Sequence, residues 1–311
     1  MKIITLTVNP AYDLHLRCTE LVPLRDNPAQ MLRKDEGGKG INVSRALSSH
    51  GVDSLCYLTL GQTDALRFSE ALCKCGLRVE YDTVRGEVRE NMHIHSPAGD
   101  TVISTAGPAV TSEAVQAARD RLLPLMDSGT VVCFSGRIAD GSDKEGLLSL
   151  LRNARAMGAR LVLDSKSLSA EEIFSLSPYL IKPNLEEAEA LLSARINGIG
   201  EAIYAANKLY ERAEGRVQNL LLTLGHLGAV LVSRSGVYKS SLPKIEAVST
   251  SGAGDSTIAG FLYAESAGCT DTDKLRYAVA FGSAACLREG SLPPLKEDTA
   301  RLFSETEIYS M

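Results

Sequence analysis

The sequence predicts an α/β protein whose mostly parallel sheet is covered by helices on both faces. Short β-branched runs alternate with amphipathic stretches along the chain, as in repeated strand–helix–strand units. One run, residues 131–134 (Val-Val-Cys-Phe), is apolar throughout, as expected for a strand buried on both faces. No internal repeat or long linker interrupts the alternation, so we expect residues 1–311 to form a single domain.

Hydrophobic periodicity sets the individual elements, because strands alternate with a period of two and helices with a period near 3.6. We expect strands at residues 3–8, 55–60, 131–134, 161–163, 220–223 and 229–232. We expect helices at residues 41–50, 65–74, 112–123, 145–157, 185–192, 199–213, 256–267 and 273–287.

Two segments break this alternation, at about residues 12–36 and 79–105. The first is polar with apolar residues at short intervals, and the second contains two strand-like runs, 91–95 and 101–104, around a turn at 97–100. Neither segment is followed by a helix. We therefore expect a small β-sheet lid, discontinuous in sequence and attached to the main sheet.

Charge and composition exclude several classes of function. Lys and Arg total 33 against 38 Asp and Glu, a net charge of -5, which argues against nucleic acid as a partner. No apolar run is long enough to span a membrane, and the first residues lack a signal-peptide pattern. The seven cysteines include no CxxC pair. We expect a reduced, cytoplasmic protein that does not act at a membrane.

The strongest local motif is residues 249–257, Ser-Thr-Ser-Gly-Ala-Gly-Asp-Ser-Thr, which leads into a helix. Backbone N–H groups at a helix N-terminus attract anions, and glycines let a phosphate approach the backbone closely. Asp255 would repel such a phosphate unless it has a task, such as accepting a proton from an attacking hydroxyl. The alternative is that Asp255 only caps the helix.

A second glycine-rich motif, Gly-Gly-Lys-Gly at residues 37–40, precedes the helix expected at 41–50. It is not a Walker A loop, because Arg33 stands where the earlier glycine belongs and Ser44 is too distant. Three glycines around Lys39 suit a sugar or its phosphate. The alternative is a glycine-rich turn with a solvated lysine.

Two further motifs suit a nucleotide and its metal. Asn184 and Glu187 follow the strand end Ile-Lys-Pro and lie one helical turn apart, so they could hold a hydrated Mg²⁺, or could form a capping box. Residues 222–230, Leu-Thr-Leu-Gly-His-Leu-Gly-Ala-Val, predict a strand, a glycine turn and a second strand, which suits nucleotide contact. A dinucleotide-binding oxidoreductase also fits the alternation, but Val8-Asn9-Pro10 follows the first strand in place of GxGxxG.

These motifs, in this order, resemble the PfkB (ribokinase-like) family of carbohydrate kinases over residues 7–290. Within it the chain is most similar to the phosphohexose branch of 1-phosphofructokinase, tagatose-6-phosphate kinase and the minor 6-phosphofructokinase. Residues 9–13 (Asn-Pro-Ala-Tyr-Asp), 37–43 (Gly-Gly-Lys-Gly-Ile-Asn-Val) and 89–91 (Arg-Glu-Asn) carry that likeness. The resemblance implies a ribokinase-like three-layer sandwich with a β-sheet lid, and a homodimer formed through the lid.

The resemblance also implies a role for each matching position. Asp255 would be the catalytic base, with an anion hole formed by Gly252, Ala253 and Gly254. The sugar phosphate would be bound by Asp13, Gly37, Gly38, Lys39, Asn42, Arg89 and Ser135, with Lys39 and Arg89 on its phosphate. ATP would be bound by Lys182, Asn184, Thr223, Gly225, Gly228, Thr250 and Ser283. Mg²⁺ would be held by Asn184 and Glu187 through water.

The implied activity is an ATP- and Mg²⁺-dependent phosphotransfer to an alcohol group. The expected acceptor is a phosphorylated ketohexose, fructose 1-phosphate, giving fructose 1,6-bisphosphate; the alternatives are tagatose 6-phosphate, fructose 6-phosphate, or a sugar-phosphate-binding protein without turnover. One departure from the branch pattern is Arg137, in Ser-Gly-Arg-Ile at 135–138, which adds a cation either to a phosphate or to solvent. His93 and His95 lack a third metal ligand and are expected to be polar lid residues.

Overall fold

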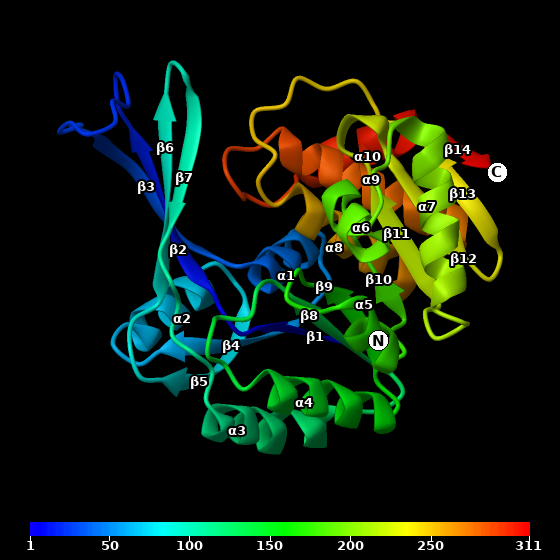
Figure 1. Cartoon of the computed structure of the whole chain (residues 1–311), viewed down its shortest axis with the longest axis horizontal. Helices are drawn as coiled ribbons and strands as arrows, with labels where there is room; N and C mark the ends of the chain where they lie inside the picture. The colour runs from blue at the N-terminus through cyan, green and yellow to red at the C-terminus, as the bar shows by residue number, and fades with distance from the viewer.

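A ten-stranded sheet forms the centre of the molecule (Figure 1), and the computed structural model describes all 311 residues. In spatial order its strands are β14 (Ile308–Ser310), β13 (Gly236–Ser240), β12 (Ala229–Ser233), β11 (Asn219–Thr223), β10 (Leu180–Ile181), β9 (Arg160–Asp164), β8 (Thr130–Ser135), β1 (Lys2–Thr7), β4 (Leu55–Gly61) and β5 (Arg78–Val84). The strands from β11 to β5 pair in parallel, and β11 to β14 pair antiparallel.

Helices cover both faces of this sheet and make three layers. One face is covered by α1 (Lys39–Ser49), α2 (Ala65–Lys74), α8 (Ala253–Ser266) and α9 (Asp271–Cys286). The other is covered by α3 (Ser112–Leu122), α4 (Lys144–Ala156), α5 (Ala170–Ser175), α6 (Leu185–Leu192) and α7 (Gly198–Arg212). Helix α10 (Lys296–Glu305) packs on α9, and two short 3₁₀ turns, η1 (Leu123–Leu125) and η2 (Gly225–Leu227), complete the elements.

Strand β8 shows why its sequence is apolar throughout. Val132 and Phe134 belong to the core cluster beneath α3 to α7, whereas Val131 and Cys133 belong to the cluster beneath α1, α8 and α9. Because successive strand residues point to opposite faces, a strand between two helical layers needs apolar side chains at every position. The expectation of a sheet buried on both faces is confirmed.

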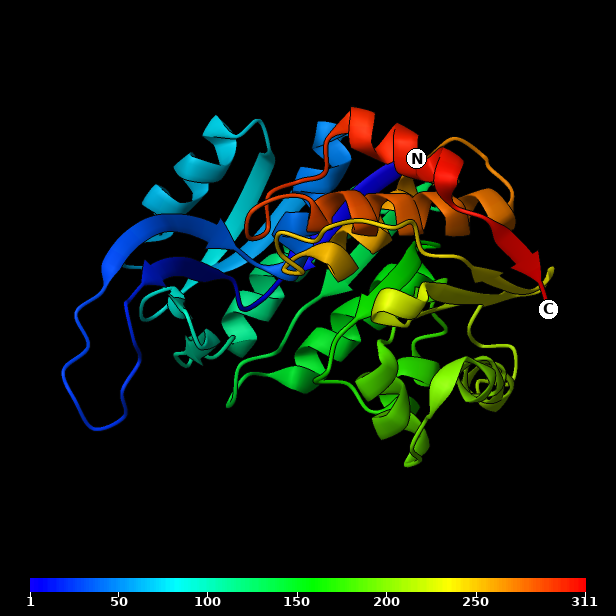
Figure 2. The same ribbon diagram turned by 90° about the horizontal axis from the view of Figure 1, so that it is seen from above.

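Four further strands form the lid, in the order β3 (Gln30–Gly37), β2 (Ala11–Arg17), β6 (Arg89–Ser96) and β7 (Gly99–Ser104). They project from one end of the main sheet, and the β2–β3 loop extends furthest from the body (Figures 1 and 2). The expected range 79–105 is corrected at its start: β5 pairs in parallel with β4 and extends the main sheet. Val84 of β5 lies in the main core, which explains this pairing.

The lid has one apolar and one polar face, because β-strand side chains alternate. Tyr12, Leu14 and Met92 pack toward α2, where the rings of Tyr12 and Phe68 lie 5.0 Å apart. The alternate residues of β2 and β6, Asp13, His15, Asn91, His93 and His95, share the opposite face. This polar face carries the chemical groups that the lid contributes.

Two helices begin earlier than their periodicity predicts, and both starts belong to the site. Helix α1 begins at Lys39 rather than residue 41, and α8 begins at Ala253 rather than residue 256. Glycine and small polar residues in these first turns have low helix propensity and no apolar face, so the sequence pattern hides them. The remaining unpredicted elements, α5, α10, β10, β13 and β14, are short or lie at the end of the chain. None of the helices has the length and apolar character that crossing a membrane requires.

Gly260 lets α8 and α9 pack closely, and we expect Gly260→Ala to destabilise the protein. A Cβ at Gly260 would lie 2.8 Å from the carbonyl carbon of Tyr277 and 2.9 Å from Cβ of Phe281. Overpacking of this kind costs about 1–3 kcal/mol. Denaturant unfolding should therefore show a lower midpoint.

The matched control is Gly200→Ala in α7, where an added Cβ would meet nothing within 4 Å. There the alanine should stabilise the helix by about 0.5–1 kcal/mol. Equal unfolding midpoints for the two variants would contradict this account of the α8–α9 packing.

Candidate active site

The N-terminus of α8 is half-buried and is not capped by a side chain. Gly252 is its N-cap residue, with φ +75°, a backbone angle that favours glycine, and no side chain accepts from the first turn. The hypothesis that Asp255 caps the helix is therefore wrong, because Asp255 lies inside the first turn. The N–H groups and the helix dipole provide a site for an anion.

Asp255 is buried within this turn, with 6% of its surface exposed. The side-chain amide of Asn42 in α1 donates to Oδ2 of Asp255 over 2.8 Å. Burial, together with the nearby Asp164 carboxylate, raises the pKa of Asp255 from 3.8 to about 6, against the opposing effects of Lys39, Asn42 and Lys182. A carboxylate with a pKa near neutrality is suited to accept a proton.

Two lysines and a second buried carboxylate surround Asp255. Nζ of Lys39 lies 3.1 Å from Oδ2 of Asp164, and Nζ of Lys182 lies 3.5 Å from Oδ1 of the same carboxylate. A Cβ on Gly254 would lie 3.4 Å from Nζ of Lys182, so this ammonium group faces the glycine turn. Burial acts to lower the pKa of Lys39, but the carboxylates of Asp164, Asp255 and Glu187 outweigh it and raise the pKa.

Asp164 is the site residue that sequence reasoning missed. It ends β9 and is 2% exposed. The only signal in the sequence is a carboxylate closing an otherwise apolar strand, Leu-Val-Leu-Asp. Its partner lysines lie 125 and 18 positions away in the chain, so only the fold brings them together.

Asp13 and Arg89 form the lid side of the site, joined through Asn91. Asn91 donates to Oδ1 of Asp13 over 2.8 Å and accepts from Arg89 over 2.8 Å. Gly37 is required beside Asp13, because a Cβ there would lie 2.7 Å from Cγ of Asp13. Gly38 is the N-cap of α1, with φ +149°.

Asn42 has one hydrogen-bonding atom free. Its amide N–H group donates a hydrogen bond to Asp255, whereas its buried Oδ1 has no hydrogen-bond partner. A buried acceptor without a partner is costly, so this atom suits a ligand hydroxyl.

Arg137 lies near enough to Arg89 to affect its ionisation. Burial lowers the pKa of Arg89, and the guanidinium of Arg137 lowers it further, against the carboxylate of Asp13. Arg137 is exposed and its partner is Asp140, at 3.4 Å. Ser135 is less accessible: it is 1% exposed and its hydroxyl lies 3.2 Å from Sγ of Cys133.

Asn184 and Glu187 form a complete capping box at the start of α6. Asn184 accepts from the Glu187 N–H over 2.8 Å, and Glu187 accepts from the Asn184 N–H over 3.0 Å. The capping hypothesis is confirmed, yet Oε1 of Glu187 is buried and has no hydrogen-bond partner. The cap therefore uses one carboxylate oxygen and leaves the other available.

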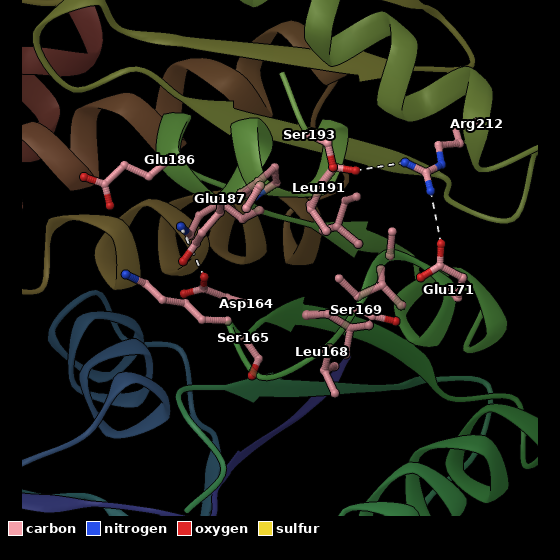
Figure 3. A pocket seen from close by; sticks show the side chains of 18 residues that line it. Asp164, Ser165, Leu168, Ser169, Glu171, Glu186, Glu187, Leu191, Ser193 and Arg212 are labelled. Atoms are coloured by element: carbon pink, nitrogen blue, oxygen red, sulfur yellow. Dashed lines mark hydrogen bonds and ion pairs between the residues drawn. The ribbon is translucent and has the colours of Figure 1, made fainter. Parts of the chain in front are cut away.

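A cavity of about 520 Å³ lies between α5, α6 and the ends of β9 and β10. Asp164 and Glu187 line one end, and the Glu171–Arg212 ion pair lies at the other (Figure 3). Lys182 also lines the cavity, beside Asp164. Oδ1 of Asp164 and Oε1 of Glu187 are buried oxygens without hydrogen-bond partners. This donor set fits Mg²⁺, which prefers one or two carboxylates together with water.

The remaining residues predicted to bind nucleotide lie on several connections around the site. Thr223 ends β11 and forms a β-bridge with Asn184. Gly225 and Gly228 bound the η2 turn with φ +57° and +89°, which explains why glycine stands at both positions. Thr250 is exposed and accepts from the Ala253 N–H, whereas Ser283 is buried in α9 with a hydroxyl that has no partner.

Comparison with known proteins gives a consistent picture of this chain's relatives. The chain is 32% identical over 289 residues to the 1-phosphofructokinase of Borreliella burgdorferi, with 92% of each chain covered. It is 28% identical to the tagatose-6-phosphate kinase of Staphylococcus epidermidis over 99% of this chain and 100% of the relative.

Solved structures agree in fold. Phosphofructokinase-2 from Escherichia coli, in complex with substrates and products, superposes with a TM-score of 0.89 at 24% identity, covering 98% and 99% of the two chains. A possible 1-phosphofructokinase from Thermotoga maritima gives 0.84 at 25% identity over the whole of both chains. The expected ribokinase-like α/β fold with a small lid sheet is confirmed.

The pfkB family carbohydrate kinase model matches residues 7–298, nearly from the first strand to α10. The family's members are phosphotransferases that use ATP and an alcohol acceptor, which accounts for an anion-binding helix N-terminus next to a buried carboxylate. By this match and by its relatives, the chain belongs to the pfkB family of carbohydrate kinases.

Proposed function

We propose that this kinase transfers the γ-phosphoryl group of ATP to the C6 hydroxyl of fructose 1-phosphate, giving fructose 1,6-bisphosphate. The observation that carries the proposal is the buried Asp255 at the uncapped N-terminus of α8, with a pKa raised to about 6 by burial and by Asp164. The Asp255 carboxylate serves as the base, while the N–H groups around it bind the phosphoryl oxygens.

Asp255 accepts the hydroxyl proton as the substrate oxygen bonds to the γ-phosphorus. The bond from that phosphorus to the oxygen bridging the β-phosphate breaks, and ADP leaves. Lys182 and the N–H groups of Gly254 and Asp255 neutralise charge on the moving group, since Lys182 faces Gly254. Catalysis of this kind depends mainly on positioning and charge neutralisation.

Lys39 belongs with the moving phosphoryl group rather than with the substrate's own phosphate. Its ammonium group pairs with Asp164, and the carboxylates that raise its pKa, Asp164, Asp255 and Glu187, surround the reacting end of the site. An incoming polyanion would compete with Asp164 for this lysine.

Mg²⁺ would be held by Glu187 and Asp164, directly or through water: Oε1 of Glu187 has no partner, and Oδ1 of Asp164 has only the ion pair with Lys182. When bound, the metal would supply positive charge to the phosphates. Asn184 caps the start of α6 and thereby fixes the orientation of Glu187.

Arg89 and Arg137 are the proposed ligands of the phosphate that the sugar already carries. Arg89 is fixed by Asn91 and by the carbonyl of Asn9, and its pKa responds to Arg137 nearby. Two guanidinium groups, one at the start of β6 and one in the connection after β8, suit a dianion through paired hydrogen bonds. Asp13 and Asn42 then hold the sugar hydroxyls.

The choice of sugar rests on the relatives' names. The 1-phosphofructokinase relative has the higher identity of the two, 32% against 28% for the tagatose-6-phosphate kinase. Fructose 1-phosphate is therefore our first candidate, and tagatose 6-phosphate is the second.

A homodimer through the lid is also part of the proposal. Met31 and Leu32 of β3 and Val102 and Ile103 of β7 expose between 41% and 54% of their surface. Exposed apolar side chains on two edge strands of a four-stranded sheet favour pairing with another copy. Light scattering of the purified protein should give about twice the chain mass of 33.3 kDa, and a monomer at working concentration would contradict the proposal.

Asp255→Asn should lower kcat by about 10²–10⁴-fold, because the amide cannot accept the hydroxyl proton. ATP affinity should change little, since the N–H groups of α8 and the two lysines remain. Steady-state kinetics with an ADP-release assay measures both quantities. Near-normal turnover of this variant would rule out Asp255 as the base.

The same role sets the pH dependence of the wild-type enzyme. As pH falls through about 6, Asp255 becomes protonated and kcat/KM should fall. The sugar phosphate also titrates in this range, so Asp164→Asn serves as the comparison. Removing the Asp164 charge lowers the pKa of Asp255 and should move the acid limb to lower pH, whereas an unmoved limb would assign it to the substrate.

The substrate assignment is tested with fructose 1-phosphate, fructose 6-phosphate, tagatose 6-phosphate and unphosphorylated sugars. We expect the highest kcat/KM with fructose 1-phosphate. Arg89→Ala and Arg137→Ala should each raise its KM by about 10–100-fold, the loss of a charged hydrogen bond. Arg121→Ala, on the distant helix α3, is the control and should leave KM unchanged.

Each outcome of this panel has a consequence. Preference for tagatose 6-phosphate or fructose 6-phosphate would replace the proposed acceptor but keep the phosphate-binding arginines. Turnover of unphosphorylated sugars alone would refute the role of Arg89 and Arg137. No turnover with any sugar would favour a binding protein on this fold.

A further inference from the structure

Three of the chain's five histidines form one column on the polar face of the lid. His15 of β2 lies opposite His93 of β6 in the strand register. The rings of His15 and His93 stack with centroids 4.8 Å apart and planes 13° apart, whereas the ring of His95 is nearly parallel to that of His15, at 5° and 5.4 Å, and meets it edge to edge. The sequence predicted His93 and His95 as polar lid residues, and only the pairing of β2 with β6 adds His15 to them.

A directed chain of hydrogen bonds fixes the proton positions in this column. Arg33 of β3 lies 3.3 Å from Nε2 of His15, and a guanidinium only donates, so Nε2 of His15 is an acceptor. Nδ1 of His15 therefore carries the proton and donates to Nε2 of His95 over 3.1 Å. Nδ1 of His95 in turn faces Oδ1 of Asp100 at 2.9 Å.

This chain keeps His15 neutral and holds its ring in one plane. Burial, together with the Arg33 guanidinium, lowers the pKa of His15. A neutral imidazole with both nitrogens bonded has one tautomer and one orientation. The stacked ring of His93 is thereby restricted as well.

Arg33 also connects the column to the body of the protein. It pairs with Asp35 on its own strand, and its NH1 lies 3.8 Å from the Glu289 carboxylate that follows α9. Ser291, two residues further, lies against the anion-hole glycine: a Cβ on Gly252 would lie 3.2 Å from Cβ of Ser291. The column is therefore fixed at its base by contacts near the reacting end of the site.

At its inner end the column reaches the carboxylate proposed to hold the sugar. Nε2 of His93 lies 3.6 Å from Oδ1 of Asp13, the oxygen that Asn91 also contacts at 2.8 Å. Burial acts to raise the pKa of Asp13, but His93 and Asn91 outweigh it and lower the pKa. Asp13 is thus kept ionised, as an acceptor of sugar hydroxyls must be.

We propose that His93 is a positioning residue for Asp13, and that His15, stacked on His93 and hydrogen-bonded to His95, holds His93 in place. The inference deepens the proposed function, on which it rests, because it explains how the lid fixes the orientation of its sugar-binding carboxylate. His93 then affects sugar affinity through its effect on Asp13.

The first experiment separates sugar affinity from turnover. His93→Ala should raise KM for the sugar phosphate by about tenfold, with kcat and KM for ATP within about twofold, as expected when a carboxylate that contacts the sugar loses the polar group that orients it. His93→Gln should restore most of the affinity, because its amide nitrogen can donate to Asp13. His15→Phe, which keeps a flat ring in the stack, should be milder than His15→Ala.

Arg17→Ala is the matched control, because Arg17 is an exposed residue at the end of β2, on the same lid face as His93. It should leave KM for the sugar unchanged. If it raises KM as much as His93→Ala does, the effect is general damage to the lid and the proposal is wrong.

A double-mutant cycle with Asp13→Asn tests whether His93 acts through Asp13. Under the proposal, His93→Ala adds little to KM once Asp13→Asn is present, because the carboxylate to be positioned is gone. Additive effects would mean that His93 contacts the sugar independently, and would overturn the positioning role.

A last measurement does not depend on the substrate and so separates this inference from the proposed function. Titration of ¹³C-labelled protein by NMR should show a higher pKa for Asp13 in His93→Ala than in the wild type, and a return toward the wild-type value in His93→Gln. An unchanged Asp13 titration would overturn the inference even in an active kinase. If the pKa of Asp13 changes as expected in both His93 variants but the enzyme phosphorylates no hexose phosphate, the inference stands and the proposed function is refuted.

Discussion

The burial of two carboxylates, Asp164 and Asp255, within one site is the constraint on which the rest of the structure depends. An uncompensated buried charge is strongly destabilising, so each needs partners that the chain must bring from elsewhere. Lys39 and Lys182 meet Asp164, and Asn42 meets Asp255. Four segments must therefore arrive together: the ends of β9 and β10, and the starts of α1 and α8.

The parallel sheet makes this meeting possible. Strands β8, β9 and β10 are neighbours, and their carboxyl ends lie at one edge, where the following loops converge. Lys182 follows β10 by one residue, and Asp164 closes β9. The two helices that begin at this edge add N–H groups and dipoles to the same place. The protein thus combines positive potential for phosphates with a carboxylate that burial keeps basic.

The lid contributes a third carboxylate, Asp13, from the polar face of its sheet. Its strands alternate between an apolar face that packs on α2 and a polar face that carries Asp13, Asn91 and the histidine column. Asp13 occupies a place that only a glycine at position 37 leaves open. Glycine is thus required at 37 by the volume of the Asp13 side chain, and is favoured at 252 by a φ of +75°.

The sequence by itself determined the α/β class, most of the helices and strands, and the glycine motifs that mark two helix starts, because these depend on local periodicity and local backbone freedom. It also predicted roles for Asp255 and Asn42, whose side chains the structure brings into contact, and for Arg89, whose role stays a prediction. It misplaced the starts of α1 and α8 and assigned β5 to the lid. Only the tertiary structure decided that Asp164 joins both lysines, that Glu187 keeps one oxygen free after capping α6, and that His15 contacts two other histidines. The physical reason is that charge pairing, burial and strand register are set by contacts between segments far apart in the chain, which no local pattern records.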